Sequence, residues 1–293
     1  MKPNKKFLRQ PKTFWAYVRS VSQHVGYTEK KNGPLKGSIK IPSIQEIADA
    51  LNDLELDASS IRSNDGGATE LGMLLHQYFV HRASALNVEM PAQLMTAKEA
   101  KAAFDELYGK HVYKCALPKN KQTGSKQGYA YLTGLVNMII EAEIGEQECN
   151  FNPQSLTTIT INRSPVRTFA RRFDGAFPSV VNPIAVWEVK EYYHTTTFGS
   201  RIADGVYETM LDGLEMEELY ASEQIKVLHY LMIDGYSTWW EKGKSYLCRI
   251  VDMLHMGYVD EVLVGREVPA LLPGIVRSWI KPESSKFSVT PRK

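Results

Sequence analysis

The sequence has no long apolar run and no apolar leader. Its best candidate for a membrane span, the stretch LVNMII, is far shorter than the roughly 18 residues needed to cross a bilayer. The basic N-terminus, MKPNKKFLRQ, lacks the apolar core of a secretory signal. We therefore expect a protein without membrane partners.

Cysteine and the common catalytic motifs are also scarce. Cys115, Cys149 and Cys248 form no Cys-x-x-Cys pair, and an odd number of cysteines favours a reducing compartment, so we expect a cytoplasmic protein. His76 and His81 are five residues apart, which is not a zinc-binding spacing. The chain contains no G-x-S-x-G, P-loop or G-x-G-x-x-G motif. These absences disfavour the corresponding hydrolase, zinc and nucleotide-binding classes.

What the chain has is the composition of a globular protein with unevenly placed charge. It has 293 residues, of which 43% are hydrophobic and 23% charged, enough to bury a core. Residues 1–40 hold ten Lys or Arg against one acid, whereas residues 41–110 hold five against eleven. A basic arm on a protein of net charge +2 can contact phosphates or can be a solvated tail. Charge alone leaves both alternatives open.

The pattern of hydrophobic residues predicts a helical first part and a different second part. Capping boxes at Ser43 with Glu46 and at Thr96 with Glu99 mark two helix starts. The predicted division is a basic arm and mostly helical region over 1–115, a polar basic connector over 116–128, and a region of mixed helices and strands over 129–293.

The second part alternates between helical and extended segments. We expect helix, three strands, helix, strand, helix, strand and helix, an order typical of an α/β protein with a central mixed sheet flanked by helices. The predicted strands are 156–162, 167–177, 184–193, 226–235 and 258–265.

One predicted strand, IAVWEVKEYY, carries charges within an apolar segment. Glu188 and Lys190 project from the same face because side chains alternate along a strand, while Trp187 points the other way. A short return through PSVVNP would bring Asp174 beside Glu188. Burying such charges is costly unless they are paired or coordinate something. The alternative is an exposed hairpin whose Glu–Lys pair contributes about a few tenths of a kcal/mol.

These residue types suit phosphate chemistry at a metal. Two converging carboxylates are hard oxygen ligands of the kind that Mg²⁺ uses. A lysine beside them can stabilise charge developing on a phosphate or help to orient the attacking water.

Asp174, followed after thirteen residues by Glu188-Val189-Lys190, resembles the PD-(D/E)xK signature of type II restriction endonucleases and related repair nucleases. The resemblance covers roughly residues 129–280, where the order of elements also matches. It implies a restriction-endonuclease-like catalytic core over 129–293 and a region over 1–115 that could help to recognise DNA. It also implies Mg²⁺-dependent cleavage of double-stranded DNA, with Mn²⁺ able to substitute. Asp174 and Glu188 would be metal ligands, and Lys190 a catalytic charge. The residue before Asp174 departs from the signature, because it is not proline.

Further site residues follow from the resemblance and from the neighbouring sequence. The family often adds an acid on the helix before the strands, where Glu141 and Glu143 are the candidates and Glu141 is preferred. Candidate DNA contacts lie on both sides of the motif, and the arginines could equally pair with acids of the following helix. These candidates are Arg167, Arg171, Arg172 and His194.

The resemblance also implies partners. Cleavage of both strands at a specific sequence usually needs two active sites, which predicts a homodimer, and a methyltransferase acting on the same DNA site is a possible companion. Two alternatives stay open. One is a structure-selective or nicking nuclease of DNA repair or recombination with the same fold. The other is a non-catalytic DNA-binding protein that retains the fold.

Overall fold

The computed structural model describes residues 1–29, 37–63, 66–120, 122, 124, 127–193 and 199–280. The first hundred residues are mainly helical, as predicted, and both capping boxes are present. These helices are α1 (Lys12–Val25), α2 (Ile44–Asp53), α3 (Glu70–Ser84), the π-helical turn η1 (Ala85–Glu89), α4 (Met90–Gln93) and α5 (Ala97–Tyr108). Helix α1 was not predicted, and it is part of the packed fold because Phe14 and Trp15 are buried in one cluster with Tyr78 of α3. Residues 1–29 are therefore not a solvated tail.

The second part is a mixed α/β unit, as predicted. Its elements are α6 (Tyr131–Ile144), β1 (Thr158–Ile161), β2 (Ser164–Thr168), β3 (Gly175–Phe177), β4 (Ala185–Glu191), α7 (Ser200–Glu223), β5 (Leu228–Asp234), the π-helical turn η3 (Ser237–Lys242), α8 (Lys244–Met256), β6 (Glu261–Val264) and α9 (Glu267–Ile280). Four strands form one sheet in the order β3-β4-β5-β6, with β3 antiparallel to β4 and the rest parallel. Strands β1 and β2 form a separate antiparallel pair.

Two predicted elements are each divided in the structure. The strand predicted over 167–177 is two strands, because β2 ends at Thr168 and β3 begins at Gly175, with Asp174 outside both. The backbone N–H of Ala170 donates to the Glu215 carboxylate of α7 (3.1 Å), so the ladder does not continue through this segment. The helix predicted from Ser237 breaks at Gly243, which separates η3 from α8.

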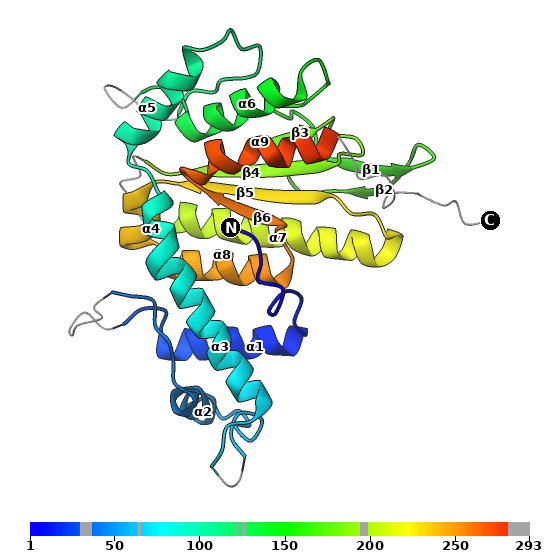
Figure 1. Ribbon diagram of the computed structural model, residues 1–293. Helices are drawn as coiled ribbons and strands as arrows, with labels where there is room; N and C mark the ends of the chain where they lie inside the picture. The colour runs from blue at the N-terminus through cyan, green and yellow to red at the C-terminus, as the bar shows by residue number, and fades with distance from the viewer. Residues whose placement is uncertain are drawn as a thin grey trace.

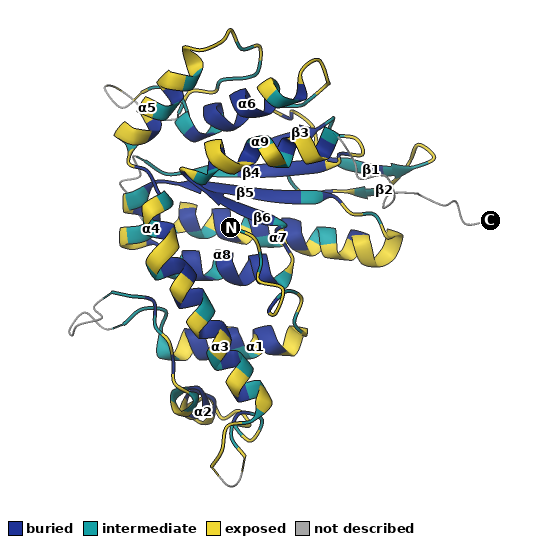
Figure 2. Ribbon diagram, viewed as in Figure 1, coloured by how far each residue is buried: buried dark blue, intermediate teal, exposed yellow. Residues whose placement is uncertain are grey.

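Helices cover both faces of the four-stranded sheet. Helices α6 and α9 lie on one face, α7 and α8 lie on the other, and α1, α2 and α3 form a further layer beyond α8 (Figure 1). Figure 2 shows that the sheet strands are largely buried while the outer sides of the helices are exposed. Trp187 of β4 stacks on Trp279 of α9 with ring centroids 5.9 Å apart. Glu188 and Lys190 therefore face the α7 side. None of the described helices combines the length and the apolar character that a bilayer crossing would need.

Candidate active site

The β3–β4 hairpin places Asp174 beside the charged end of β4. Gly175 pairs with Trp187, and the backbone N–H of Asp174 donates to the Trp187 carbonyl (3.1 Å). The Val189 N–H donates to Asp174 Oδ2 (2.7 Å), which fixes this carboxylate against the strand that carries Glu188. A Cβ at Gly175 would enter the Trp187 ring, so this close approach requires glycine. The structure thus brings Asp174 to the position predicted from the sequence.

Glu188 and Lys190 lie on the same face and contact each other, as alternation predicts. Lys190 Nζ lies 2.8 Å from Glu188 Oε2 and 3.0 Å from Glu208 Oε2 of α7. The Glu188 side chain is fully buried and that of Lys190 is 12% exposed. This burial removes the alternative of an exposed hairpin whose Glu–Lys pair lies on the surface.

Arg171 joins the same group of acids. Its Nη1 lies 2.9 Å from Glu188 Oε1 and its Nη2 donates to Glu188 Oε2 (3.1 Å), the forked arrangement that suits a guanidinium and a carboxylate. Nη1 also donates to Asp212 Oδ2 of α7 (2.7 Å), and Nη2 lies 3.3 Å from Glu208 Oε2. The acids Asp174, Glu188, Glu208 and Asp212 form what we call the carboxylate cluster.

Within the part of the chain that the structure describes, four carboxylates of this cluster meet two cations. Protein packed around the Asp174 carboxylate, followed by the charge of Glu188, raises the pKa of Asp174 to about 6, although the residue is exposed on its cavity side. Burial raises the pKa of Asp212 to about 7 against the opposing effect of Arg171. Asp174 and Asp212 are thus the acids of the cluster whose ionised forms the site disfavours.

The central pair has opposite behaviour. Burial alone would raise the pKa of Glu188, but Lys190 and then Arg171 outweigh it and hold that pKa below its ordinary value. Burial would lower the pKa of Lys190, yet the charges of Glu188 and Asp174 outweigh it and raise that pKa. Lys190 is therefore an ammonium at neutral pH, suited to stabilising negative charge rather than to accepting a proton.

The cluster opens on a cavity of about 600 Å³. Asp174, Lys190 and Glu208 line it, together with Pro118 and Lys119 of the predicted connector. Several aromatic side chains complete the wall: Tyr129, Tyr131, Phe151, Tyr192 and Tyr193. A lining that combines cations with aromatic rings can accommodate a phosphate with an attached base.

Glu141 and Glu143 lie elsewhere. The Glu141 carboxylate accepts from the backbone N–H of Lys114 (2.9 Å) and of Cys115 (3.2 Å), and Glu143 pairs with Arg277 of α9 (2.9 Å). Neither residue lines the cavity. The structure therefore does not bring the preferred metal ligand on α6 into the carboxylate cluster, and the additional acids come from the helix after β4 instead.

Glu208 and Asp212 are the site residues that the sequence reasoning missed. They are four positions apart on α7, and Asp204, which also lines the cavity, lies four positions before Glu208. Residues four apart share one face of a helix, so this acidic stripe was a usable signal. The sequence predicts these acids only as alternative partners of the arginines and not as part of the site.

The predicted DNA contacts have mixed outcomes. Arg167 pairs with Glu218 of α7 (2.6 Å), so it and Arg171 both make the acid pairs that were the alternative to phosphate binding. Arg172 is exposed. His194 lies outside the described residues. Of the four candidates, only Arg172 is both described and directed to the surface without a carboxylate partner among the described residues.

Glu191, two residues after Val189, is half-buried on the opposite side of β4 from the cluster. It accepts from the Leu132 N–H (2.9 Å) and the Thr133 hydroxyl (2.9 Å) at the start of α6. Burial raises the pKa of Glu191 to about 7 against these hydrogen bonds. This carboxylate therefore caps the start of α6.

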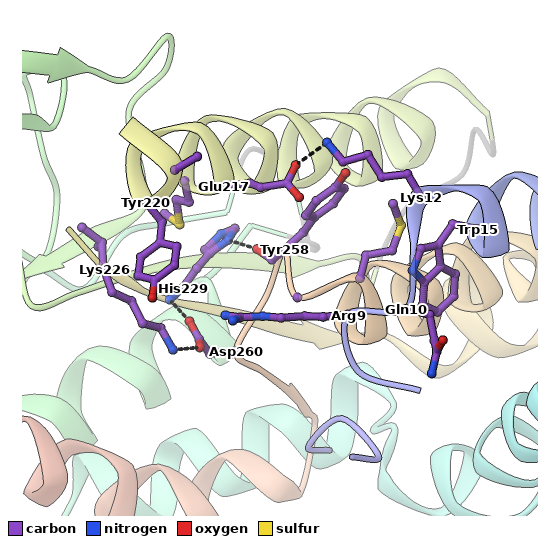
Figure 3. A pocket seen from close by; sticks show the side chains of 15 residues that line it. Arg9, Gln10, Lys12, Trp15, Glu217, Tyr220, Lys226, His229, Tyr258 and Asp260 are labelled. Atoms are coloured by element: carbon purple, nitrogen blue, oxygen red, sulfur yellow. Dashed lines mark hydrogen bonds and ion pairs between the residues drawn. The ribbon is translucent and has the colours of Figure 1, made fainter. Parts of the chain in front are cut away.

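A second cavity, of about 260 Å³, lies between the N-terminal segment, α7 and the turn before β6. Figure 3 shows its two lysines paired with acids, Lys12 with Glu217 (3.0 Å) and Lys226 with Asp260 (2.6 Å). Its buried His229 contacts the Tyr258 carbonyl through Nδ1 (2.8 Å). These matched pairs differ from the acid excess of the carboxylate cluster, which makes the first cavity the candidate active site.

The described residues contain no group of three or more His, Cys, Asp or Glu side chains already arranged around a common metal position. In the carboxylate cluster, Lys190 and Arg171 lie between the acids. Both cations contact Glu188, so this carboxylate is paired with protein cations in the structure.

Comparison with protein families assigns the chain to families whose descriptions name no activity. Residues 95–279 match a family described as a domain of unknown function (DUF7687), and residues 1–89 match a second one, DUF7690, with the same description. Because the first match spans more than half of the chain, the protein belongs to the DUF7687 family. No curated protein and no solved structure matches the chain.

Proposed function

We propose that this protein is a Mg²⁺-dependent endonuclease with a restriction-endonuclease-like core, which hydrolyses phosphodiester bonds of double-stranded DNA as type II restriction enzymes do. The observation that carries the proposal is the convergence of Asp174, Glu188 and Lys190 at one end of the β3–β4 hairpin, on the wall of a cavity. These three residues are the ones that the PD-(D/E)xK signature specifies. The mixed sheet, with α6 before the strands and α7 after β4, supports the same assignment.

The residues present fit a divalent cation. The donor set consists of carboxylate oxygens, which are the hard ligands that Mg²⁺ prefers. The described part of the cluster has two more acids than cations, and buried Asp212 Oδ1 has no hydrogen-bond partner among the described residues. Asp174 and Glu188 would hold the ion, with Glu208 beside them. When bound, Mg²⁺ supplies positive charge that neutralises the substrate phosphate.

Lys190 supplies the other positive charge. Its ammonium, held between Glu188 and Glu208, lines the cavity where a scissile phosphate would lie. Stabilisation of charge that develops on the phosphate is worth more in such a partly buried site than in water. Arg171 orients Glu188 through two contacts and so acts as a positioning residue.

The experiment is to incubate the purified protein with supercoiled plasmid and phage DNA in Mg²⁺ or in EDTA. Discrete fragments that require Mg²⁺ would support a restriction enzyme. Nicks or smears would instead support the nuclease of repair or recombination. No cleavage in any divalent metal would contradict an enzymatic function and favour the DNA-binding alternative.

Two matched variants locate the activity. Asp174→Asn keeps the size of the side chain but removes its charge, and we expect it to abolish cleavage. Asp105→Asn makes the same change on the surface of α5 and should cut normally, since among the described residues this aspartate pairs with Lys101 of its own helix alone. Cleavage by Asp174→Asn at the rate of the wild type would show that the assigned site is wrong.

A further inference from the structure

A groove between α1, α7 and α8 holds two arginines that have no carboxylate partner among the described residues. Its volume is about 410 Å³. We call it the arginine groove, and the residues that define it are Arg19, Tyr27, Tyr207, Met210 and Arg249. It is separate from the cavity of the candidate active site, and no residue lines both.

Arg249 of α8 is held by tyrosines rather than by an acid. Its guanidinium carbon lies 5.4 Å from the ring centre of Tyr27, 5.9 Å from that of Tyr207 and 5.1 Å from that of Tyr246. Nη1 also donates to the Tyr207 hydroxyl (3.1 Å). Contacts with aromatic faces and hydroxyls orient a guanidinium but leave its positive charge uncompensated.

Arg19 is also left without a compensating acid in the described chain. It is exposed, and its contacts are with the sulfur atoms of Met210 and Met256, both at 3.5 Å. The one acid that lines the groove, Asp252, is 4% exposed and is already bonded to Arg82. The groove therefore keeps two positive charges.

Five other arginines contact carboxylates, namely Arg82, Arg167, Arg171, Arg266 and Arg277. Further arginines of the described chain, such as exposed Arg172, also lack a carboxylate partner. What distinguishes the arginine groove is that two such arginines line one cavity together with tyrosines.

We propose that the arginine groove binds the phosphodiester backbone of the DNA on which the enzyme acts. This inference rests on the proposed function, since it takes that DNA as the ligand. A planar guanidinium presents its N–H donors as a fork that matches two phosphate oxygens, and the tyrosines fix one such fork in place. The ligand chemistry is therefore a phosphodiester rather than an apolar or cationic group.

The charge of the active site gives a physical reason for a separate anchor. The carboxylate cluster has an excess of acids, so without a metal it repels a phosphate at the place where cleavage would occur. Binding of DNA before the metal must then come from positive charge elsewhere on the surface. The arginine groove supplies that charge, independently of Mg²⁺.

Helix α7 places the groove within reach of the same DNA. Gly205 and Glu208 line the active-site cavity, whereas Val206, Tyr207 and Met210 line the groove. At 3.6 residues per turn these two sets lie on opposite sides of the helix, about 10–12 Å apart with side chains included. That separation corresponds to about three nucleotide steps of about 3.4 Å along one strand. Contact with both places would require one duplex to lie across α7.

The test measures binding of a short fluorescent DNA duplex by anisotropy, in EDTA and over a series of salt concentrations. We compare the wild type with Arg249→Gln, Arg19→Gln and the double variant. Each loss of a phosphate contact should weaken binding about three- to tenfold and lower the slope of log K against log salt by about 1. Arg277→Gln is the matched control, since this arginine pairs with Glu143 on α9, and it should bind as the wild type does.

The melting temperature of each variant separates a structural role from a binding role. If Arg249 only ties α8 to its tyrosines, Arg249→Gln will melt earlier while its salt slope stays that of the wild type, and the inference is overturned. An unchanged affinity in the double variant, or no binding by the wild type, overturns it too. If the wild type cleaves DNA but neither arginine affects its affinity for DNA, this inference is contradicted and the nuclease proposal is not. If the affinity depends on the arginines but no metal supports cleavage, the nuclease proposal is contradicted and the binding of DNA in the groove is not.

Discussion

Two groups of charges in this protein, one buried and one partly exposed, differ in balance and in access. The first joins α1, α3 and α8: Arg82 Nη1 lies 3.2 Å from both oxygens of Asp252, and Nη2 donates to the Ser22 hydroxyl (3.0 Å). The side chains of Arg82 and Asp252 are 1% and 6% exposed. One cation meets one acid and both side chains are almost fully buried, although Asp252 also lines the arginine groove, so the charges of this closed pair are balanced within the protein.

The carboxylate cluster lacks both properties. Its acids outnumber its cations among the described residues, and three of its members and neighbours, Asp174, Lys190 and Glu208, line a cavity. Protein packed around these carboxylates, and then the charge of Glu188, raises the pKa of Asp174 and of Asp212, so their ionised forms cost stability. An arrangement that costs stability and is open to ligands is typical of a functional site. The comparison therefore separates a structural ion pair from a candidate metal site.

The largest effect should come from breaking the closed pair. We expect Arg82→Met to lower the free energy of unfolding by about 3–5 kcal/mol, because it leaves Asp252 buried without its partner. Chemical denaturation measures this change. The double variant Arg82→Met with Asp252→Leu should recover part of the loss. A loss below about 1 kcal/mol in the single variant would mean that the pair is not the closed structural unit described above.

Mg²⁺ should act on the open cluster and not on the closed pair. At about 100 times its Kd, the ion should raise the free energy of unfolding by about 2.7 kcal/mol near pH 8. The gain should shrink near pH 5, where Asp174, with a pKa of about 6, binds a proton instead. Thermal melts with and without Mg²⁺ check this, and Glu188→Gln should lose the gain while Arg277→Gln keeps it. Equal stabilisation of Glu188→Gln would place the metal elsewhere.

The hairpin that presents Asp174 gives the next effect. We expect Gly175→Ala to cost about 1–3 kcal/mol, because the added methyl group meets the Trp187 ring and forces the strands apart. Gly274→Ala is the control, since its nearest neighbour is the flexible end of Arg277 at 3.9 Å. Denaturation curves give the free energy of unfolding of both variants. Equal values for the two would contradict the argument that close packing of Gly175 on Trp187 sets the position of Asp174.

The smallest effect concerns Asp212. Its folded pKa of about 7 exceeds its ordinary value of 3.8, so the native state binds the proton more tightly, and stability falls as pH rises between these values. Without metal, Asp212→Asn should therefore be more stable than the wild type near pH 8, by on the order of 1 kcal/mol, and about equal near pH 4. Unfolding measured across this range tests the sign. A variant that is less stable near pH 8 would contradict the excess of acid.

Much of the fold and the central trio could be predicted because they depend on local rules. The capping boxes and the alternation along β4 are read from neighbouring residues, and the short return after β3 limits where Asp174 can lie. The further acids could not be placed on the same basis. Glu141 lies on α6 and Glu208 on α7. Whether either side chain faces β4 depends on how its helix is rotated about its own axis, and the packing of segments distant in the sequence determines that rotation. The arginine groove is a sharper case, since Arg249 and Tyr27 are 222 positions apart.

The most direct test of the nuclease proposal is the rate of plasmid cleavage in Mg²⁺ by the wild type and by Lys190→Met, measured with enzyme in excess over DNA. We predict Mg²⁺-dependent cleavage by the wild type and a loss of at least about 100-fold in the variant, because the positive charge beside the phosphate is gone. Asp174→Asn serves as a second variant should Lys190→Met fold poorly. Cleavage by both variants at the rate of the wild type, or none by the wild type in Mg²⁺ or Mn²⁺, would contradict the proposal.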